Sequence, residues 1–209
     1  RTALINQAVT RWLDPDVELV DSGVEWIGKI PKGWEVRKVK YMIDWIQIWP
    51  FWSMIKSEFV TVSGYKMYWQ ENLIKSSFEE WNKYVNEEKY RELEKYSIKP
   101  GDILISMMWT IGKCEIVPYW IKEWIIDSHL IRLRISEKKC LNRFFQLIFS
   151  NSWYVKEWLS INSKWSIMSW LNSTIIKTTD LVIPSIAEQQ KIDDFLTRYN
   201  EKIENAASK

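Results

Sequence analysis

The segment Pro100-Gly101-Asp102-Ile103-Leu104-Ile105-Ser106 decides the fold, because it places a turn directly before a short apolar run. Pro-Gly is typical of a tight turn, and a short apolar run after a turn predicts a strand. Thr110-Ile111-Gly112-Lys113 provides a second turn, and residues 114–118 have the composition of the strand that follows it. The sequence therefore predicts a β-hairpin at the centre of the chain.

Further short strands are predicted on both sides of this hairpin. Residues 35–39 and 181–184 each read as a short strand. Residues 125–135 alternate apolar and polar side chains in Leu130-Ile131-Arg132-Leu133-Arg134-Ile135, and a period of two predicts a half-buried strand. The middle of the chain is thus expected to be a domain of short strands joined by loops.

Two amphipathic helices are predicted in the last third of the chain. Residues 142–159 place Phe145, Ile148, Phe149 and Trp153 at core-facing spacings. Residues 187–202 form a second helix, whose apolar side chains make a narrow stripe typical of a coiled-coil seam. The residues expected to pair with another helix are Ile192, Phe195, Leu196, Tyr199 and Ile203. The expected fold class is α/β (α+β): a globular domain of short strands and packed helices, followed by a coiled-coil-forming helix.

The composition is that of a folded protein, with 46% hydrophobic and 27% charged residues. The formal net charge is only +2, so any basic surface must be local. Cys114 and Cys140 lack metal-ligand spacing and suit a reducing compartment. No apolar run approaches the roughly 18 residues of a membrane span. We expect a cytoplasmic protein that does not contact a membrane.

Several separated motifs, in the expected order, resemble the specificity subunits of type I restriction–modification systems. Residues 21–28, Ile30-Pro31 and Gly33-Trp34-Glu35-Val36 resemble the beginning of a target-recognition domain in that family. The hairpin motifs of residues 100–106 and 110–113 resemble its central hairpin. The end of the family's target-recognition domain leads into a conserved helix. In this chain the resemblance to that part is carried by Asn172, Ile175, Pro184 and Glu188-Gln189-Gln190-Lys191-Ile192. The resemblance extends over essentially the whole chain.

The resemblance implies a domain organisation. Residues 1–13 would be the end of a preceding conserved helix, ended by Asp14-Pro15-Asp16, and residues 14–34 a linker leading into the domain. Residues 35–186 would form the target-recognition domain, and residues 187–209 the start of the conserved C-terminal helix. We interpret the chain as the C-terminal half of a specificity subunit; a free-standing half-subunit is the alternative.

The resemblance also implies a function. Such a domain reads one half of a split target in double-stranded DNA, while paired helices fix the spacing between halves and dock the methyltransferase (M) subunits. The restriction (R) subunits join indirectly. S-adenosylmethionine, ATP and Mg are expected on the partner subunits, and no cofactor on this one. The chain is expected to be a non-catalytic subunit of the endonuclease and adenine methyltransferase complex.

The sequence independently supports the expectation that this chain is non-catalytic. They include no Gly-rich phosphate loop, no Asn/Asp-Pro-Pro-aromatic quartet and no paired His/Cys metal set. The single histidine, His129, has no nucleophile or orienting acid evident nearby in the sequence, so we expect a hydrogen-bonded structural role. The run Glu87-Glu88-Lys89 is expected to be a solvated helix face. Tyr65, Tyr68 and Phe51 are expected to pack in the protein.

Four loops supply the groups that DNA reading requires: residues 49–57, 68–75, 108–113 and 162–168. Lysines contact phosphates, while amides and hydroxyls form hydrogen bonds with base edges. The predicted DNA-binding set is Lys56, Gln70, Asn72, Lys113, Lys164 and Ser166.

The chain holds 15 tryptophans and only six glycines, although average glycine usage is roughly 7%. Many of these tryptophans lie where loop chemistry favours glycine: Trp12, Trp49, Trp52, Trp69, Trp109, Trp165 and Trp170. Trp26 and Trp34, in contrast, fit the family pattern. We hypothesise that the source organism reads a UGA codon as glycine where a different table gives tryptophan. UGG codons at these positions would exclude this hypothesis.

Two other interpretations remain open at this point. The chain could be the recognition domain of a fused restriction–methyltransferase polypeptide, which a methyltransferase motif upstream would reveal. It could instead be a scaffold that binds proteins and not DNA, which a flat salt dependence of binding would favour. The target base sequence does not follow from the loops.

Overall fold

The computed structural model describes residues 2–11, 16–48, 59–80, 83–108, 110–122, 124–164 and 171–207. It confirms the predicted mixture of helices and short strands. The predicted central hairpin is present: β8 (Ile103–Ser106) pairs antiparallel with β9 (Cys114–Ile116). The hairpin belongs to a sheet with the order β4-β11-β8-β9, in which β4 spans Ile43–Ile48 and β11 spans Leu130–Ile135.

The central sheet has a core on each face, because successive side chains of a strand point to opposite sides. Ile103, Ile105 and Ile131 lie in the larger core. Leu104 and Leu130, one residue out of phase with them, lie in the smaller core. Both faces of β8 are therefore buried, which explains its apolar run. The prediction that residues 130–135 form a half-buried strand is wrong, because every residue of β11 except Arg134 is buried, Arg132 included.

The larger core is covered by α1 (Thr2–Arg11), α4 (Asn142–Asn151), α5 (Trp153–Lys164) and α7 (Ile186–Ala207). The single helix predicted over residues 142–159 is wrong, because the helix breaks at Ser152, which has an extended backbone (φ −65°, ψ 129°). Phe145, Ile148 and Phe149 are buried as predicted, whereas Trp153 is 47% exposed.

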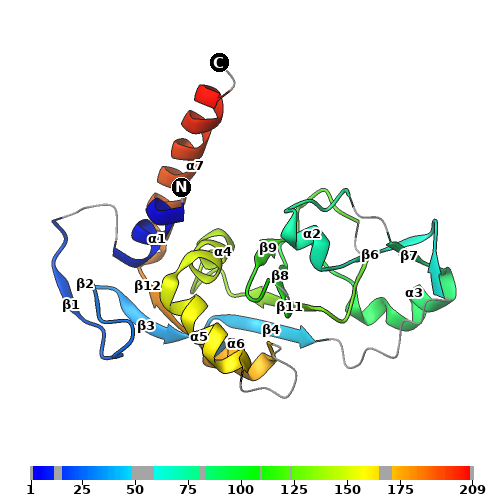
Figure 1. Cartoon of the computed structure of the whole chain (residues 1–209), viewed down its shortest axis with the longest axis horizontal. Coiled ribbons are helices and arrows are strands. Elements are labelled where there is room, and N and C mark those ends of the chain that lie inside the picture. The colour runs from blue at the N-terminus through cyan, green and yellow to red at the C-terminus, as the bar shows by residue number, and fades with distance from the viewer. Residues whose placement is uncertain are drawn as a thin grey trace.

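The smaller core includes residues of a second sheet, which has the order β10-β6-β7-β5. Figure 1 labels β6 and β7 of this sheet. Its strands are β5 (Val60–Thr61), β6 (Tyr65–Tyr68), β7 (Lys83–Val85) and β10 (Ile125–Ile126). The helices of this part are α2 (Gln70–Ile74), α3 (Glu87–Leu93) and the 3-10 turn η4 (Glu94–Tyr96). The strand predicted over residues 125–135 is thus two strands, β10 and β11.

The beginning and the end of the domain are joined. Within the predicted linker, β1 (Leu19–Asp21) and β2 (Lys29–Pro31) form a hairpin, and β3 (Glu35–Lys38) pairs antiparallel with β12 (Asp180–Ile183). The short helices η1 (Val39–Tyr41) and α6 (Ser173–Thr178) pack nearby. The Trp34 indole N–H also donates to Glu188 Oε1 at 3.4 Å. Two predicted family motifs, far apart in the sequence, are therefore in contact.

The helix α7 begins with a capping box. The Ser185 backbone N–H donates to Glu188 Oε2 at 3.1 Å, and the Glu188 N–H donates to Ser185 Oγ at 3.3 Å. Gln189 is fully buried: its Oε1 accepts from the Leu141 N–H and its Nε2 donates to the Pro184 carbonyl. The Glu-Gln pair thus starts α7 and ties it to the start of α4.

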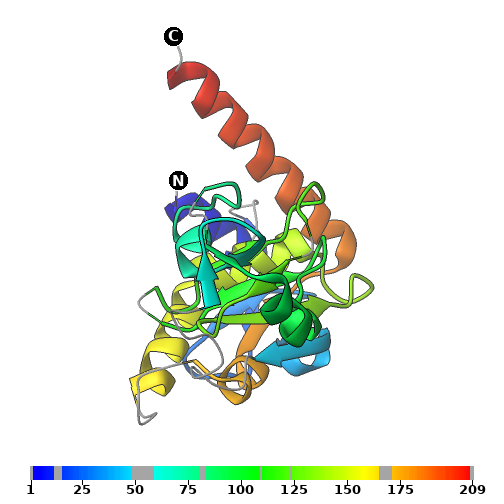
Figure 2. The ribbon, with the colours of Figure 1, turned by 90° about the vertical axis from the view of Figure 1, so that its right-hand side faces the viewer.

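Beyond this point α7 projects away from the body of the molecule (Figures 1 and 2). Its predicted pairing stripe is divided. Ile192 and Leu196 are 0% and 2% exposed in the domain's own core, so they are not free to pair with another helix. Phe195 is partly buried, while Tyr199 and Ile203 are 36% and 42% exposed. None of the helices in the described ranges has the length and apolar character needed to span a membrane.

Candidate nucleic-acid interface

Residues that flank the four predicted DNA-reading loops converge at one end of the central sheet. Ile48, the last residue of β4, pairs with Ile131, which pairs in turn with Ile105 of the hairpin. The Leu171 N–H donates to the Met107 carbonyl at 3.2 Å. Segments preceding residue 49, entering the hairpin tip and following residue 170 therefore meet at this end, which we call the loop end.

The helix α2 is attached to the loop end by a charged network. Lys113 Nζ lies 2.8 Å from Glu115 Oε1 and donates to Ser76 Oγ at 3.1 Å. Ser76 Oγ donates to Glu115 Oε1 at 2.6 Å, and Gln146 Nε2 of α4 donates to Glu115 Oε2 at 2.6 Å. Ser76 follows α2 with a φ of 50°, a left-handed conformation that is uncommon for serine. Glu115 thus connects the hairpin, α2 and α4.

A second lysine joins Lys113 beside the hairpin tip. A recess of about 380 Å³ is lined by Thr110, Lys113 and, from α5, Lys156. Gly112 makes this approach possible: its φ is +79°, and a Cβ there would lie 2.7 Å from Leu159 Cδ1. Sequence reasoning missed Lys156, because nothing in the sequence places the tip against α5. The hydroxyl and the two cations suit a phosphate group.

Asn72 has a structural role, which corrects its predicted contact with DNA. Its side chain is fully buried. Oδ1 accepts from the Trp69 N–H at 3.0 Å, and Nδ2 donates to the carbonyls of Ser77 and Glu80 at 3.0 and 2.8 Å. An amide whose groups are all engaged inside the protein cannot also read a base edge.

The structure describes the other predicted DNA-binding residues only in part. Gln70 is the first residue of α2 and half-buried, and its buried Oε1 has no hydrogen-bond partner within the part of the chain that the structure describes. Lys164 is the last residue of α5, and its side chain is not among those described. Lys56 and Ser166 lie outside the described residues, as does Phe51. Contact of Lys56, Gln70, Lys164 and Ser166 with DNA stays a prediction, as does the packing of Phe51.

His129 is hydrogen-bonded as expected, but the expectation that no orienting acid lies nearby is wrong, because Asp127 holds its imidazole. In the turn before β11, its Nδ1 lies 2.5 Å from Asp127 Oδ2 and its N–H donates to Asp127 Oδ1 at 3.0 Å. The hydrogen bond that Asp127 accepts raises the pKa of His129, and burial opposes this effect. The backbone also joins this turn to the loop end, since the Met107 N–H donates to the His129 carbonyl at 2.9 Å.

Most of the remaining candidates pack as expected. Tyr68 is 2% exposed, and Tyr65 stacks on Tyr90 at 4.0 Å between ring centroids. The run Glu87-Glu88-Lys89 begins α3, and Glu87 and Glu88 are exposed as expected. For Lys89 the expected solvated position is wrong, because the residue is 7% exposed and its Nζ lies 2.7 Å from Glu92 Oε2. Cys114 and Cys140 are free, buried thiols, and burial raises the pKa of Cys140 to about 12. Within the described ranges no three His, Cys, Asp or Glu side chains are grouped to hold a metal ion.

A buried ionic network supports the base of the hairpin. Asp102 is fully buried and lies 2.5 Å from Arg132 Nε and 2.7 Å from Arg134 Nη2. Its Oδ2 also accepts from the Lys99 N–H at 2.7 Å. Arg132 donates in addition to the Ser97 carbonyl and lies over the Trp45 ring. The carboxylate therefore fixes the turn that opens β8 against β11.

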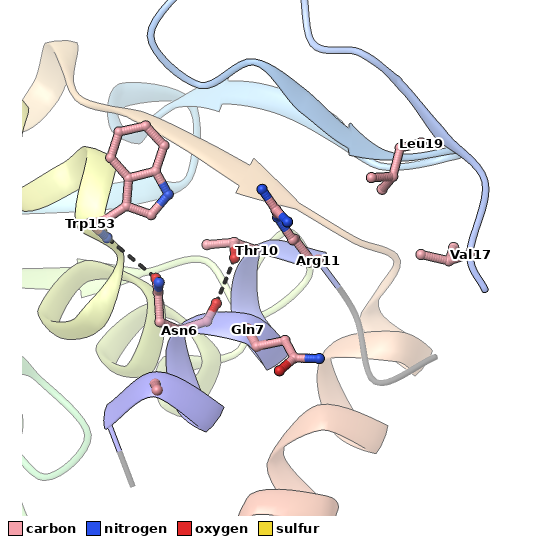
Figure 3. A pocket seen from close by; sticks show the side chains of 8 residues that line it. Asn6, Gln7, Thr10, Arg11, Val17, Leu19 and Trp153 are labelled. Carbon is pink, nitrogen blue, oxygen red and sulfur yellow. Dashed lines mark hydrogen bonds between the residues drawn. The ribbon is translucent and has the colours of Figure 1, made fainter. Parts of the chain in front are cut away.

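A separate pocket of about 600 Å³ lies between α1, β1 and α5 (Figure 3). Its polar side chains come mostly from α1. The Trp153 N–H donates to Asn6 Oδ1 at 3.3 Å, and Thr10 Oγ1 donates to the Asn6 carbonyl at 2.6 Å. The first bond links α1 to α5, and the second lies within α1, so Asn6 and Thr10 have partners inside the domain.

Only Trp69 among the seven named glycine-like positions lies in the described residues. Its φ of −139° and ψ of −179° are open to any residue, so the backbone there does not require glycine. Trp69 is nevertheless the N-cap of α2, where glycine is preferred to large side chains. Its indole N–H is buried and has no hydrogen-bond partner among the described residues. Hydrogen bonding favours the glycine hypothesis at this position, while backbone conformation does not.

The chain belongs to the family of type I restriction modification DNA specificity domains, whose sequence profile matches residues 31–209. It is similar in fold to the HsdS subunit from Thermoanaerobacter tengcongensis, with 13% identity and a TM-score of 0.61 over 98% of this chain and 43% of that one. A structure described as the basis of complex assembly and conformational transition of the type I R-M system is also similar, with 14% identity and a TM-score of 0.62 over 98% and 44% of the two chains.

A third similar structure is the S subunit of a type I restriction–modification system from M. genitalium, with 13% identity and a TM-score of 0.52. That match covers 85% of this chain and 43% of the other. The chain thus spans less than half the length of these structures. A search of curated protein sequences returned no match.

Proposed function

We propose that this chain is the target-recognition domain of a type I specificity subunit and reads one half of a split target in double-stranded DNA. The observation that carries the proposal is the loop end. Flanking residues of the predicted reading loops meet there, next to Lys113 and Lys156. Loops on a rigid sheet can present base-reading side chains together, while the lysines contact phosphates.

The proposal includes partner subunits. The exposed Tyr199 and Ile203 on the projecting part of α7, with Phe195, offer an apolar stripe to another helix. We propose that this pairing sets the spacing of the half-sites and helps to dock the methyltransferase subunits, with the restriction subunits joining through them. In this scheme the chain is non-catalytic and cytoplasmic, and S-adenosylmethionine, ATP and Mg bind to the partners.

Selection of duplexes from a random library tests the proposal. The protein, mixed with its methyltransferase subunits, is expected to enrich one short sequence and to lose affinity steeply as salt rises. Enrichment of no sequence, together with salt-independent binding to the methyltransferase subunits, would contradict the proposal and support a protein scaffold.

A further inference from the structure

We propose that Glu115 sets DNA specificity by holding the positive charge of Lys113 away from phosphates. This inference rests on the proposed DNA-reading function and concerns the same loop end. In the free protein, Glu115 competes with DNA for Lys113. A duplex of unrelated sequence can contact Lys113 only after it displaces the Glu115 carboxylate. A duplex with the target sequence makes additional base contacts, and their free energy offsets the cost of this displacement.

The geometry places the carboxylate for this role. Glu115 Oε1 lies 2.8 Å from Lys113 Nζ, and the side chains are 14% and 34% exposed. The carboxylate is thus held mostly inside the protein, while the lysine remains within reach of a ligand. Lys156, on the same recess, is exposed and has no acidic partner among the described residues. The two lysines therefore differ in whether their charge is already neutralised.

The surrounding bonds hold Glu115 in place without depending on its charge. Ser76 donates to Oε1 and Gln146 donates to Oε2. A glutamine at position 115 keeps one carbonyl oxygen, which can accept from Gln146 Nε2, while the Ser76 hydroxyl can accept from the new NH₂ group. Gln146 then keeps its hydrogen bonds with Arg143 and the Cys114 carbonyl. The substitution Glu115→Gln therefore removes the charge and preserves the size and most hydrogen bonds of the network.

Fluorescence anisotropy with a duplex of unrelated sequence, titrated at several salt concentrations, tests the inference. Each phosphate contact contributes about 0.9 to the slope of log K against log salt. Glu115→Gln is expected to bind this duplex more tightly, with a slope steeper by about 0.9. The matched control Glu201→Gln removes an exposed carboxylate from α7 and should leave the slope unchanged.

A second variant separates this role from a structural one. In the Glu115→Gln background, Lys113→Ala should reduce the steepness of log K against log salt by about 0.9. In the wild-type background, the same substitution should reduce it by clearly less than about 0.9. A full loss in the wild-type background would overturn the inference, even if Glu115→Gln failed to fold. An unchanged slope in folded Glu115→Gln would also overturn it and leave the proposed function standing. If the wild-type protein bound no duplex at any salt concentration, the proposed function would fail, and this inference with it.

Discussion

The substitution Asp102→Asn tests whether the buried ionic network stabilises the central hairpin. It keeps an acceptor for the Lys99 N–H but removes the negative charge that faces two arginines. Arg132 is 7% exposed and would lose its ion pair with the Asp102 carboxylate. Breaking a buried ion pair in this way costs about 3–5 kcal/mol.

The structure narrows this range for Asp102→Asn. Arg132 retains the Ser97 carbonyl and the Trp45 ring, which favours the lower end. Arg134 is 45% exposed, so solvent screens its loss and it adds at most about 1 kcal/mol. We expect a decrease of about 3–4 kcal/mol in the free energy of unfolding, measured by urea denaturation with an unchanged m-value.

A matched control is Asp44→Asn, which removes an exposed carboxylate from β4 and should change stability by less than about 0.5 kcal/mol. A loss below about 1 kcal/mol in Asp102→Asn would refute the reasoning, because it would mean that Arg132 does not depend on the carboxylate.

Three further predictions concern the loop end and its supports. Asn72→Ala should lower the free energy of unfolding by about 3 kcal/mol, since it leaves the Trp69 N–H and two carbonyls without their partner, and a change below about 1 kcal/mol in urea denaturation would contradict its buried role. Gly112→Ala should be destabilised by about 1–3 kcal/mol through its φ of +79° and the close Leu159, so a melting temperature equal to that of the wild type would contradict this packing. His129→Asn should cost more stability near pH 6 than near pH 9, because the folded-state pKa of His129 lies above the ordinary value of 6.5; its pairing with Asp127 stabilises fully below that value and is lost as the pH rises through the folded-state pKa. A difference in unfolding free energy that does not vary with pH would exclude the ion pair.

The sequence predicted the elements whose signals are local. Pro100-Gly101 and the apolar run after it specify β8, and the short strand at residues 181–184 appears as β12 at Asp180–Ile183. The last helix was also predicted, from its regular apolar spacing, and the structure adds a capping box of Ser185 and Glu188 at its start. Each of these signals depends on residues within a few positions of one another.

The breaks in two predicted elements depend on more distant contacts. No Gly or Pro marks the end of α4 at Ser152; the change of direction lets the Tyr154 hydroxyl accept from the Val182 N–H of β12. The break between β10 and β11 has a local cause, because Asp127 Oδ1 accepts from the His129 N–H in an Asx turn. That second break could have been found from the sequence, since aspartate is typical of such turns.

The candidate site was predicted by region more reliably than by residue. The loops were chosen by their polar composition, and their flanking residues do meet at one end of the sheet. Composition does not tell whether an Asn faces solvent or the protein, and Asn72 proved to be buried. Lys156 and Glu115 acquire their places only when the hairpin tip packs on α5 and α2 docks on β9. Tertiary packing, rather than sequence spacing, therefore determines which charges share the site.

The central claim is that this chain directs a methyltransferase to one half of a split DNA target. Single-molecule sequencing of the host genome, with and without the gene, tests this claim most directly. The account predicts that methyl-adenine disappears from one split motif when the gene is deleted and returns when it is restored. An unchanged methylome, with the protein expressed and bound to active methyltransferase subunits, would contradict the claim.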